Sequence, residues 1–240
     1  MARTPDPGDL AARYWRDGFV VLPHVFSPRE CREWKAECQR VLDTVRQEAR
    51  GRGDDPDGLF PGGVYVGLSR RSGLFARAAA DPRVLGPLCA ILGPNVEFLS
   101  DKVVFKDGRE DAPSPWHQDY PYWKGPHKLS VWIALDDATE DNGCLKLVPG
   151  SHGGEMAHTN VQSQHGFGNR ILDVDETTAV SAPVEAGGAV IFHDLTLHAS
   201  HPNRTGADRW AVITTYRDAT ASEPEEMAWP AAMVVAGHGR

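Results

Sequence analysis

Two histidines, an aspartate and an arginine in the second half of the chain have the residue types of a metal centre. His117 and Asp119 are separated by one residue. His198 follows much later, with Arg209 beyond it. Two imidazole nitrogens and one carboxylate oxygen form the ligand set of mononuclear iron(II) oxygenases and leave three positions on the metal open. A guanidinium could bind a dicarboxylate cosubstrate through two parallel hydrogen bonds. The order His, Asp, His, Arg therefore predicts an iron-dependent oxygenase.

Each part of this pattern also has an ordinary structural explanation. In an extended segment His117 and Asp119 would project to the same side and could reach one metal ion. A surface histidine beside a turn aspartate is the alternative. Arg209 begins an apolar strand, where a cation is costly unless it is paired, and a protein carboxylate could be its partner. In combination with the ligand pattern, a cosubstrate carboxylate is the favoured partner.

A second histidine competes with His198 for the distal position. His193 and His198 each precede an arginine by eleven residues, Arg204 and Arg209, so spacing does not choose between them. Arg204 lies in a predicted turn, where its side chain would be solvated, whereas strand alternation can aim Arg209 inward. We therefore predict that His198 is the ligand and that His193 lies at the surface or behind the ligands.

The elements that must position these residues are mostly short. The opening predicts helix, strand and helix, with the second helix running from the capping box at Ser27 to about Val45. A further helix is predicted over residues 81–93, and the glycine-rich residues 49–63 predict a mobile loop. From Asn95 onward, β-branched and aromatic residues predict strands at 95–100, 102–106, 128–135, 144–148, 188–193 and 209–216.

This element order predicts a fold that is mainly β with flanking helices. Many short strands with helices gathered at the front are typical of a double-stranded β-helix, the cupin-like jelly roll. We expect it to form a single domain over residues 1–240. Residues 151–182 have little apolar periodicity, and a loop of this length is usually a lid or a binding loop. We therefore expect a lid insertion there.

Composition excludes several classes of function. A net charge of −8 disfavours nucleic-acid binding, which needs a concentrated basic surface. No apolar run approaches the roughly 20 residues that cross a bilayer, and the first residues lack the apolar segment of a secretory signal. The four cysteines form no CxxC pair, which favours buried, reduced thiols. We expect a cytoplasmic enzyme, monomeric or homodimeric, with no membrane or nucleic-acid partner.

Further segments extend the pattern over nearly the whole chain. They are Asp17–Pro23, Trp116–Asp119, Val131–Asp137, Asn142–His152 and His198–Asn203, followed by Arg209. Together these segments resemble the phytanoyl-CoA dioxygenase-like branch of the iron(II)/2-oxoglutarate oxygenases.

The resemblance implies that His117, Asp119 and His198 bind iron(II), with 2-oxoglutarate and O2 as cosubstrates. The reaction would release succinate and CO2 and oxidise an unactivated C–H bond of a small organic molecule in specialised metabolism. Hydroxylation is the expected outcome, and desaturation or ring formation would use the same oxidant.

The resemblance also implies residues around the cosubstrate. Arg209 would pair with a carboxylate of 2-oxoglutarate, and Ser200 would give that carboxylate a second hydrogen bond. Trp132 would form a wall beside it. Lys106 could reach the same region, although a solvated lysine at a strand edge is an equal alternative. Candidates for the substrate pocket, with core or lid packing as the alternative for each, are Tyr65, Gln118, Tyr120, Trp123 and Phe192.

Three other functions could use a similar site. A halogenase would need a small residue in place of the carboxylate ligand, and Asp119 is present. A zinc-dependent hydrolase could use the same ligands, but it leaves Arg209 without a role and normally needs a separate general base. A non-catalytic metal-binding jelly roll would bind metal without substrate-stimulated formation of succinate.

Overall fold

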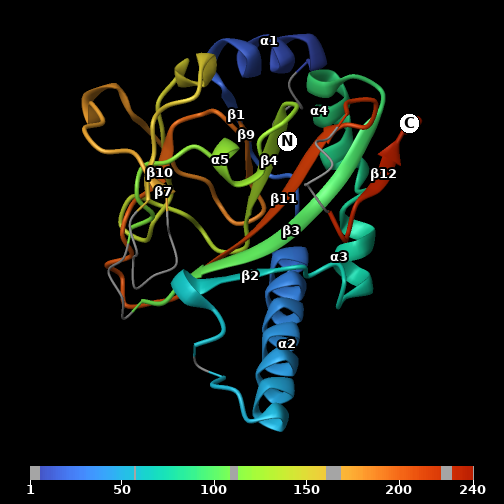
Figure 1. Cartoon of the computed structure of the whole chain (residues 1–240), viewed down its shortest axis with the longest axis vertical. Helices are drawn as coiled ribbons and strands as arrows, with labels where there is room; N and C mark the ends of the chain where they lie inside the picture. Colours follow the sequence, from blue (N-terminus) through green and yellow to red (C-terminus); the bar gives the residue numbers. More distant parts are fainter. Residues whose placement is uncertain (1–5, 57, 109–112, 161–168, 223–228, 240) are drawn as a thin grey trace.

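Two antiparallel sheets form the centre of the molecule in the computed structural model, which describes residues 6–56, 58–108, 113–160, 169–222 and 229–239 (Figure 1). The larger sheet has the spatial order β1 (Phe19–Leu22), β9 (Ala189–His193), β4 (Lys128–Ala134), β11 (Arg209–Asp218), β3 (Val96–Lys106) and β12 (Met233–Ala236), and β2 (Val64–Val66) also pairs with β3. The smaller sheet has the order β10 (His198–Ser200), β5 (Leu145–Leu147) and β8 (Val180–Ala182). The predicted mainly β jelly roll with flanking helices is confirmed.

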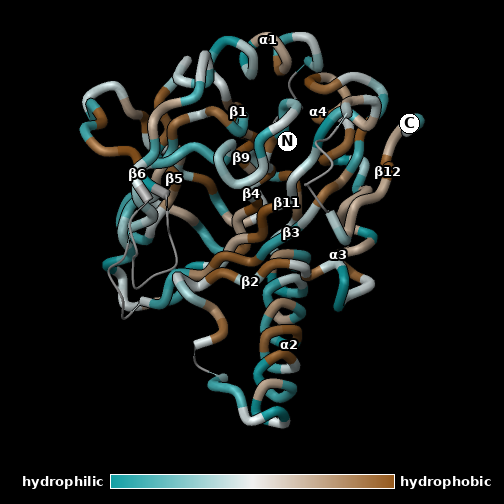
Figure 2. The backbone as a smooth tube through the Cα atoms, in the orientation of Figure 1, coloured by the Kyte–Doolittle hydropathy of each residue, from teal (hydrophilic) through white to brown (hydrophobic). Residues whose placement is uncertain are grey.

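Strand alternation sends successive residues of the larger sheet into two different cores. On β4, Val131 and Ile133 join a core shared with the helices, whereas Trp132 joins the core between the two sheets. Every residue of β4 is buried, because both faces of the sheet are covered. Figure 2 shows hydrophobic residues along β2 and β4 and in bands along the second helix, whereas the outer loops are mostly hydrophilic.

Helices cover the face of the larger sheet that points away from the smaller one. They are α1 (Pro7–Asp17), α2 (Pro28–Arg52), α3 (Gly73–Ala78) and α4 (Pro82–Leu92). Tyr14, Trp34 and Leu88 from these helices pack in the same core as Val131 and Val212. No helix within the described residues is long and apolar enough to span a membrane.

Helix α2 begins where the sequence predicts and ends later. Its capping box is formed, since the Ser27 backbone N–H donates to the Glu30 carboxylate and the Glu30 N–H donates to the Ser27 hydroxyl. The prediction of a loop over 49–63 is wrong at its start, because residues 49–52 are helical. Ala49 is buried, and the helix terminates only at Gly53, whose φ of 81° is left-handed. Residues 61–63 form the 3-10 turn η1 (Pro61–Gly63), and residue 57 lies outside the described residues.

Strand β3 is continuous where the sequence predicts two strands. The predicted break between 95–100 and 102–106 is wrong, because the polar residue at that point, Asp101, is buried and accepts hydrogen bonds from the backbone and hydroxyl of Ser69. The register against β11 shifts where Thr215 pairs with Ser100 and Tyr216 with Phe98. A bulge of this kind bends a strand without ending it.

The segment 151–182 is only partly an insertion. Its last three residues form β8, which pairs with β5 in the smaller sheet, so the prediction of an insertion as far as residue 182 is wrong. Its own elements are η2 (Ser151–Gly153), the paired strands β6 (Thr159–Asn160) and β7 (Asn169–Arg170), and η3 (Glu176–Thr178). Residues 161–168 of the predicted lid lie outside the described residues.

Replacing two glycines by alanine tests the turn before β9 and the end of α2. The two substitutions should change the free energy of unfolding in opposite directions. Gly187 has φ +90°, and a Cβ there would lie 2.0 Å from the Phe26 carbonyl oxygen. Gly187→Ala should therefore lower the free energy of unfolding by about 2 kcal/mol or more. Gly51 lies in α2 with open space around it, so Gly51→Ala should raise the free energy of unfolding by about 0.5–1 kcal/mol.

Urea titration of the two variants beside the unmodified chain measures both changes. A neutral Gly51→Ala would show that residues 49–52 are not helical in solution. A neutral Gly187→Ala would show that this turn does not approach Phe26 as closely as described.

Candidate active site

Three ligand-type side chains converge between the two sheets. His117 and His198 form an isolated antiparallel bridge, in which each backbone N–H donates to the other's carbonyl at 2.9 and 3.0 Å. The Nε2 atoms of His117 and His198 lie 3.8 and 3.9 Å from Oδ1 of Asp119. All three residues are buried, and their ligand atoms lie within 4.8 Å of one another. The arrangement fits one metal ion with a facial set of two nitrogens and one oxygen.

Hydrogen bonds orient each of these side chains. Nδ1 of His117 contacts the Pro115 carbonyl and Nδ1 of His198 contacts the Thr196 carbonyl, both at 2.8 Å. A carbonyl only accepts, so each Nδ1 carries the proton and each Nε2 presents its lone pair. The Ser130 hydroxyl donates to Oδ2 of Asp119 at 3.2 Å. The trio is therefore aligned before any metal binds.

Burial and neighbouring charges keep the trio in its metal-binding protonation state. Burial lowers the pKa of His117 to about 3 and also lowers the pKa of His198. Burial by itself would raise the pKa of Asp119, but the neighbouring Lys102, His198 and His117 outweigh it, so this pKa lies below its ordinary value. Two neutral imidazoles and one carboxylate form a donor set suited to a divalent cation.

Arg209 supplies a buried positive charge beside the trio. It is 2% exposed, and its Nη2 donates to the Gly143 carbonyl at 3.0 Å. Among the described residues, its Nε and Nη1 atoms have no hydrogen-bond partner, and no carboxylate forms an ion pair with it. Burial lowers its pKa to about 10. Among the described residues no protein carboxylate is therefore its partner, and the N–H groups of Nε and Nη1 remain available for an anion.

A cavity of about 70 Å³ joins Arg209 to the trio. Trp132 lines it, with the Arg209 guanidinium 5.2 Å from the centre of its ring. Ser200 also lines it, and its hydroxyl oxygen accepts from the Ser114 N–H, so the hydroxyl proton can still be donated. The side chains on the remaining walls are mostly apolar: Val64, Val104, Leu145, Phe192 and Ile213. The site therefore fits a dicarboxylate held between a guanidinium and a metal.

Comparison with known proteins supports the same assignment. The family model described as phytanoyl-CoA dioxygenase (PhyH) matches residues 14–211, which includes the whole site. The chain belongs to the phytanoyl-CoA dioxygenase family. It is therefore a non-haem iron(II)- and 2-oxoglutarate-dependent oxygenase, and the buried guanidinium with two unpartnered N–H atoms fits that cosubstrate.

Relatives and solved structures of this family match the chain over most of its length. An L-proline trans-4-hydroxylase of Streptomyces griseoviridis is 28% identical over 88% of this chain and 87% of its own length. An ectoine dioxygenase of Stutzerimonas stutzeri is 27% identical over 90% of this chain and 78% of its own. A non-heme monooxygenase, ThoJ, superposes with a TM-score of 0.79 at 27% identity, covering 96% of this chain and 84% of its own.

A further neighbour is the non-heme alpha-ketoglutarate-dependent epimerase SnoN from nogalamycin biosynthesis. It superposes with a TM-score of 0.73 at 26% identity, covering 93% of this chain and 89% of its own. The family fold is therefore compatible with an outcome other than hydroxylation.

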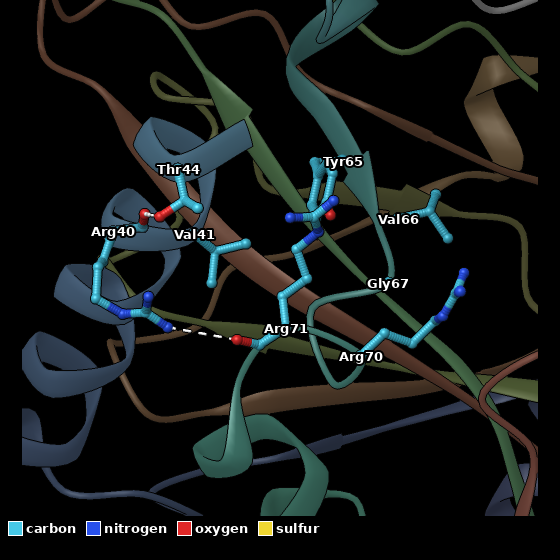
Figure 3. Close-up of a pocket in the computed structure, with 8 residues that line it drawn as sticks. All are labelled: Arg40, Val41, Thr44, Tyr65, Val66, Gly67, Arg70 and Arg71. Carbon is cyan, nitrogen blue, oxygen red and sulfur yellow. Dashed lines mark hydrogen bonds between the residues drawn. The ribbon is translucent and has the colours of Figure 1, made fainter. Parts of the chain in front are cut away.

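Of the residues that the sequence suggested for the substrate pocket, Phe192 lines the cavity. Tyr65 faces the other side of β2, in a groove of about 410 Å³ beside α2 (Figure 3). Trp123 packs near Trp229, and Tyr120 begins the short helix α5 (Tyr120–Trp123). Among the described residues that line the groove in Figure 3, none is a histidine, cysteine or carboxylate. We therefore assign the chemistry to the smaller cavity.

The side chain of Gln118 points away from the metal trio. Its amide nitrogen donates to the carbonyls of Gly154 and Leu195, and its carbonyl oxygen accepts from the Met156 N–H. Its own backbone N–H donates to Nε2 of His158. Gln118 therefore anchors residues 154–158 to the segment that carries His117 and Asp119.

Strand β3 contributes a lysine to the cavity that the sequence analysis missed. Lys102 lines the cavity, whereas Lys106, four residues further along, is not among its described lining residues and is buried beside Gly143. Residues 102, 104 and 106 share one face of the strand. The predicted strand 102–106 already places Lys102 on the same face as Lys106, but the sequence analysis considered only Lys106.

His193 is buried, so a surface position for it was wrong. Its ring stacks on His127 with centroids 3.9 Å apart, and its Nδ1 lies 2.9 Å from Oδ1 of Asp194. The ring of Tyr14 in α1 is stacked with that of His193, with centroids 6.2 Å apart, and the Tyr14 hydroxyl lies 3.2 Å from Nε2 of His127. His193 belongs to a separate cluster that joins α1 to β9.

Replacing each histidine in turn tests the ligand assignment. His198→Ala should weaken iron(II) binding by more than about 100-fold, because loss of a partner behind a ligand alone typically costs 10–100-fold. His193→Ala should leave iron(II) affinity within about threefold, since its ring contacts the α1 cluster. Metal titration of the apo chain under nitrogen measures both affinities, and thermal unfolding of each variant checks that it folds. The reverse order of affinities would assign the distal ligand to His193.

Proposed function

We propose that the chain binds iron(II) through His117, Asp119 and His198. The cation would be held by donors that are already oriented, because backbone carbonyls fix both imidazoles and Ser130 fixes the carboxylate. Bound there, iron supplies the oxidising chemistry that no protein side chain provides, using O2 and 2-oxoglutarate. The protein contributes position and the exclusion of water.

We further propose that Arg209 binds the distal carboxylate of 2-oxoglutarate. This proposal rests on two buried guanidinium nitrogens, Nε and Nη1, which have no hydrogen-bond partner among the described residues. Ser200 would donate a hydrogen bond to the same carboxylate, and Trp132 would pack against the cosubstrate chain. Lys106 pairs with Arg209 across β3 and β11, so we assign it to support of that strand end.

The proposed reaction is oxidation of an unactivated C–H bond in a small organic molecule of specialised metabolism, with release of succinate and CO2. An L-proline trans-4-hydroxylase and an ectoine dioxygenase among the relatives support a small substrate, as does the epimerase from nogalamycin biosynthesis. The enzyme would act in the cytoplasm. Residues 154–158 would lie beside the bound substrate, since Gln118 ties them to the segment that carries His117 and Asp119.

The rival functions fit the cavity less well. A hydrolase needs a general base besides the ligands, and among the described residues lining the cavity Asp119 is the one carboxylate. A halogenase needs the position of Asp119 to be vacated for a halide. A protein that only binds metal has no use for a buried guanidinium directed at the same cavity.

A spectroscopic measurement tests the proposed function. Iron(II) and 2-oxoglutarate added together under nitrogen should give a weak visible charge-transfer band that neither gives alone, because the cosubstrate chelates the metal through its 2-oxo acid group. Asp119→Ala should abolish the band and succinate formation. Tight zinc binding with no such band would support the hydrolase or the non-catalytic protein instead.

Arg204 and Arg209, which each follow a histidine by eleven residues, provide a matched test of cosubstrate binding. Arg209→Met should raise the KM for 2-oxoglutarate about 100-fold, because the carboxylate loses a buried partner, while iron(II) affinity is kept. Arg204→Met should change that KM less than twofold, since Arg204 lies exposed in a turn. Steady-state succinate formation measures both.

The stability of the apo variant gives a second readout for Arg209. Removing a buried cation without an ion-pair partner should leave the free energy of unfolding unchanged or raise it. An Arg209→Met chain that is much less stable, with an unchanged KM for 2-oxoglutarate, would make Arg209 a structural residue.

A further inference from the structure

The cavity contains a second positive charge that the cosubstrate does not need. Lys102 lines it together with His117, Asp119 and His198. Its side chain is half-buried, and among the described residues no hydrogen bond or ion pair engages its ammonium group. A lysine that is partly desolvated beside a metal site is costly unless an anion pairs with it.

Lys102 and Arg209 lie at different ends of the cavity. Across β3 and β11, Arg209 pairs with Lys106, whereas Lys102 pairs with Ile213. At roughly 3.3 Å per residue, these two levels are about 13 Å apart along the sheet. That span exceeds the length of a five-carbon dicarboxylate, so a cosubstrate anchored at Arg209 leaves the Lys102 end to the second reactant.

Lys102 is the more exposed of the two cationic residues, because it is half-buried whereas Arg209 is 2% exposed. Val66, which pairs with Lys102 across β2 and β3, is 59% exposed. Tyr122 is 45% exposed, with its ring centroid 6.4 Å from that of His117. Lys102 is therefore placed to meet an incoming molecule.

The charges also leave room for one more anion. With the proposed iron(II) and 2-oxoglutarate in place, the metal, Asp119, Arg209 and the cosubstrate dianion together balance, because both imidazoles are neutral. The ammonium of Lys102 then remains as one uncompensated positive charge in a water-poor site. A single carboxylate on the substrate would neutralise it.

We propose that Lys102 binds a carboxylate of the primary substrate, so that the enzyme acts on small carboxylic acids rather than on neutral molecules. This inference rests on the proposed function, since it assigns iron(II) and 2-oxoglutarate to the other end of the cavity. The Lys102 ammonium holds the acid group, and the apolar part of the substrate lies against apolar walls of the cavity such as Val64 and Val104.

Matched pairs of acids and amides test this inference. The probes are L-proline, hexanoate and phenylacetate, each beside its primary amide. They are added under nitrogen to the chain with iron(II) and 2-oxoglutarate, and binding is followed by perturbation of the visible band. At least one acid should bind about tenfold or more tightly than its amide, because an ion-paired hydrogen bond is lost in the amide. The same acid should stimulate succinate formation in air.

Three variants assign the preference to the lysine. Lys102→Met keeps the length of the side chain without its charge and should bring acid and amide within about twofold of each other. Lys102→Arg keeps the charge and should retain the preference. Arg70→Met removes a positive charge from the exposed groove on the other side of β2 and should leave the preference unchanged.

Specific outcomes would overturn the inference. Equal binding of acid and amide in every pair, or binding of neither, would show that the cavity does not select carboxylates. A tenfold weaker binding of 2-oxoglutarate in Lys102→Met, with the acid preference kept, would assign Lys102 to the cosubstrate. Failure of the proposed function itself would appear earlier, as absence of the visible band before any probe is added.

Discussion

The reciprocal hydrogen bonds between the backbones of His117 and His198 are the contact on which the site depends. They join the segment that follows β3 to β10, an edge strand of the smaller sheet. These two parts of the chain are far apart in sequence. Because the bonds fix both backbones, the two imidazoles lie side by side and Asp119 reaches their Nε2 atoms. Both histidines therefore lie at the edge of the smaller sheet, while the larger sheet contributes Arg209 and Ser130, whose hydroxyl donates to Asp119. The sandwich of the two sheets thus brings the parts of the site together.

The same sandwich explains how the chain tolerates Arg209. An unpaired buried cation opposes folding, and here the surrounding cores stabilise the strand that carries it. Trp132 packs beside the guanidinium and Gly143 accepts one of its N–H groups, so part of the desolvation cost is offset. The remainder is relieved only when an anion binds. In the proposed function, binding of the cosubstrate carboxylate would relieve this cost, and local costs of this kind are concentrated at functional sites.

The sequence predicted the metal trio and Arg209 because these residues combine chemistry with spacing, and it predicted the jelly roll because turn residues bound the short strands. Other features depended on tertiary contacts. Asp101 was interpreted as a strand break, whereas in the fold it lies within β3 and accepts hydrogen bonds from Ser69. Helix α2 continues to Arg52, beyond the apolar periodicity that ends at about Val45, because Ala49 is buried. Gln118 lies between His117 and Asp119, and Tyr65 lies on β2 beside β3. The directions of both side chains depend on the fold and could not be predicted from their positions in the sequence.

Strand alternation also explains why His193 and Phe192, neighbours in sequence, belong to different parts of the molecule. On β9, Val190 and Phe192 face the core between the sheets, whereas Ile191 faces the helices. His193 follows the same alternation and meets Tyr14 of α1. A one-residue slip of β9 would exchange the two faces and bring an imidazole into the cavity in place of the Phe192 ring. The pairing of β9 with both β1 and β4 holds it in register. The distal histidine of the proposed iron site therefore comes from β10, where the backbone bridge to His117 fixes its direction.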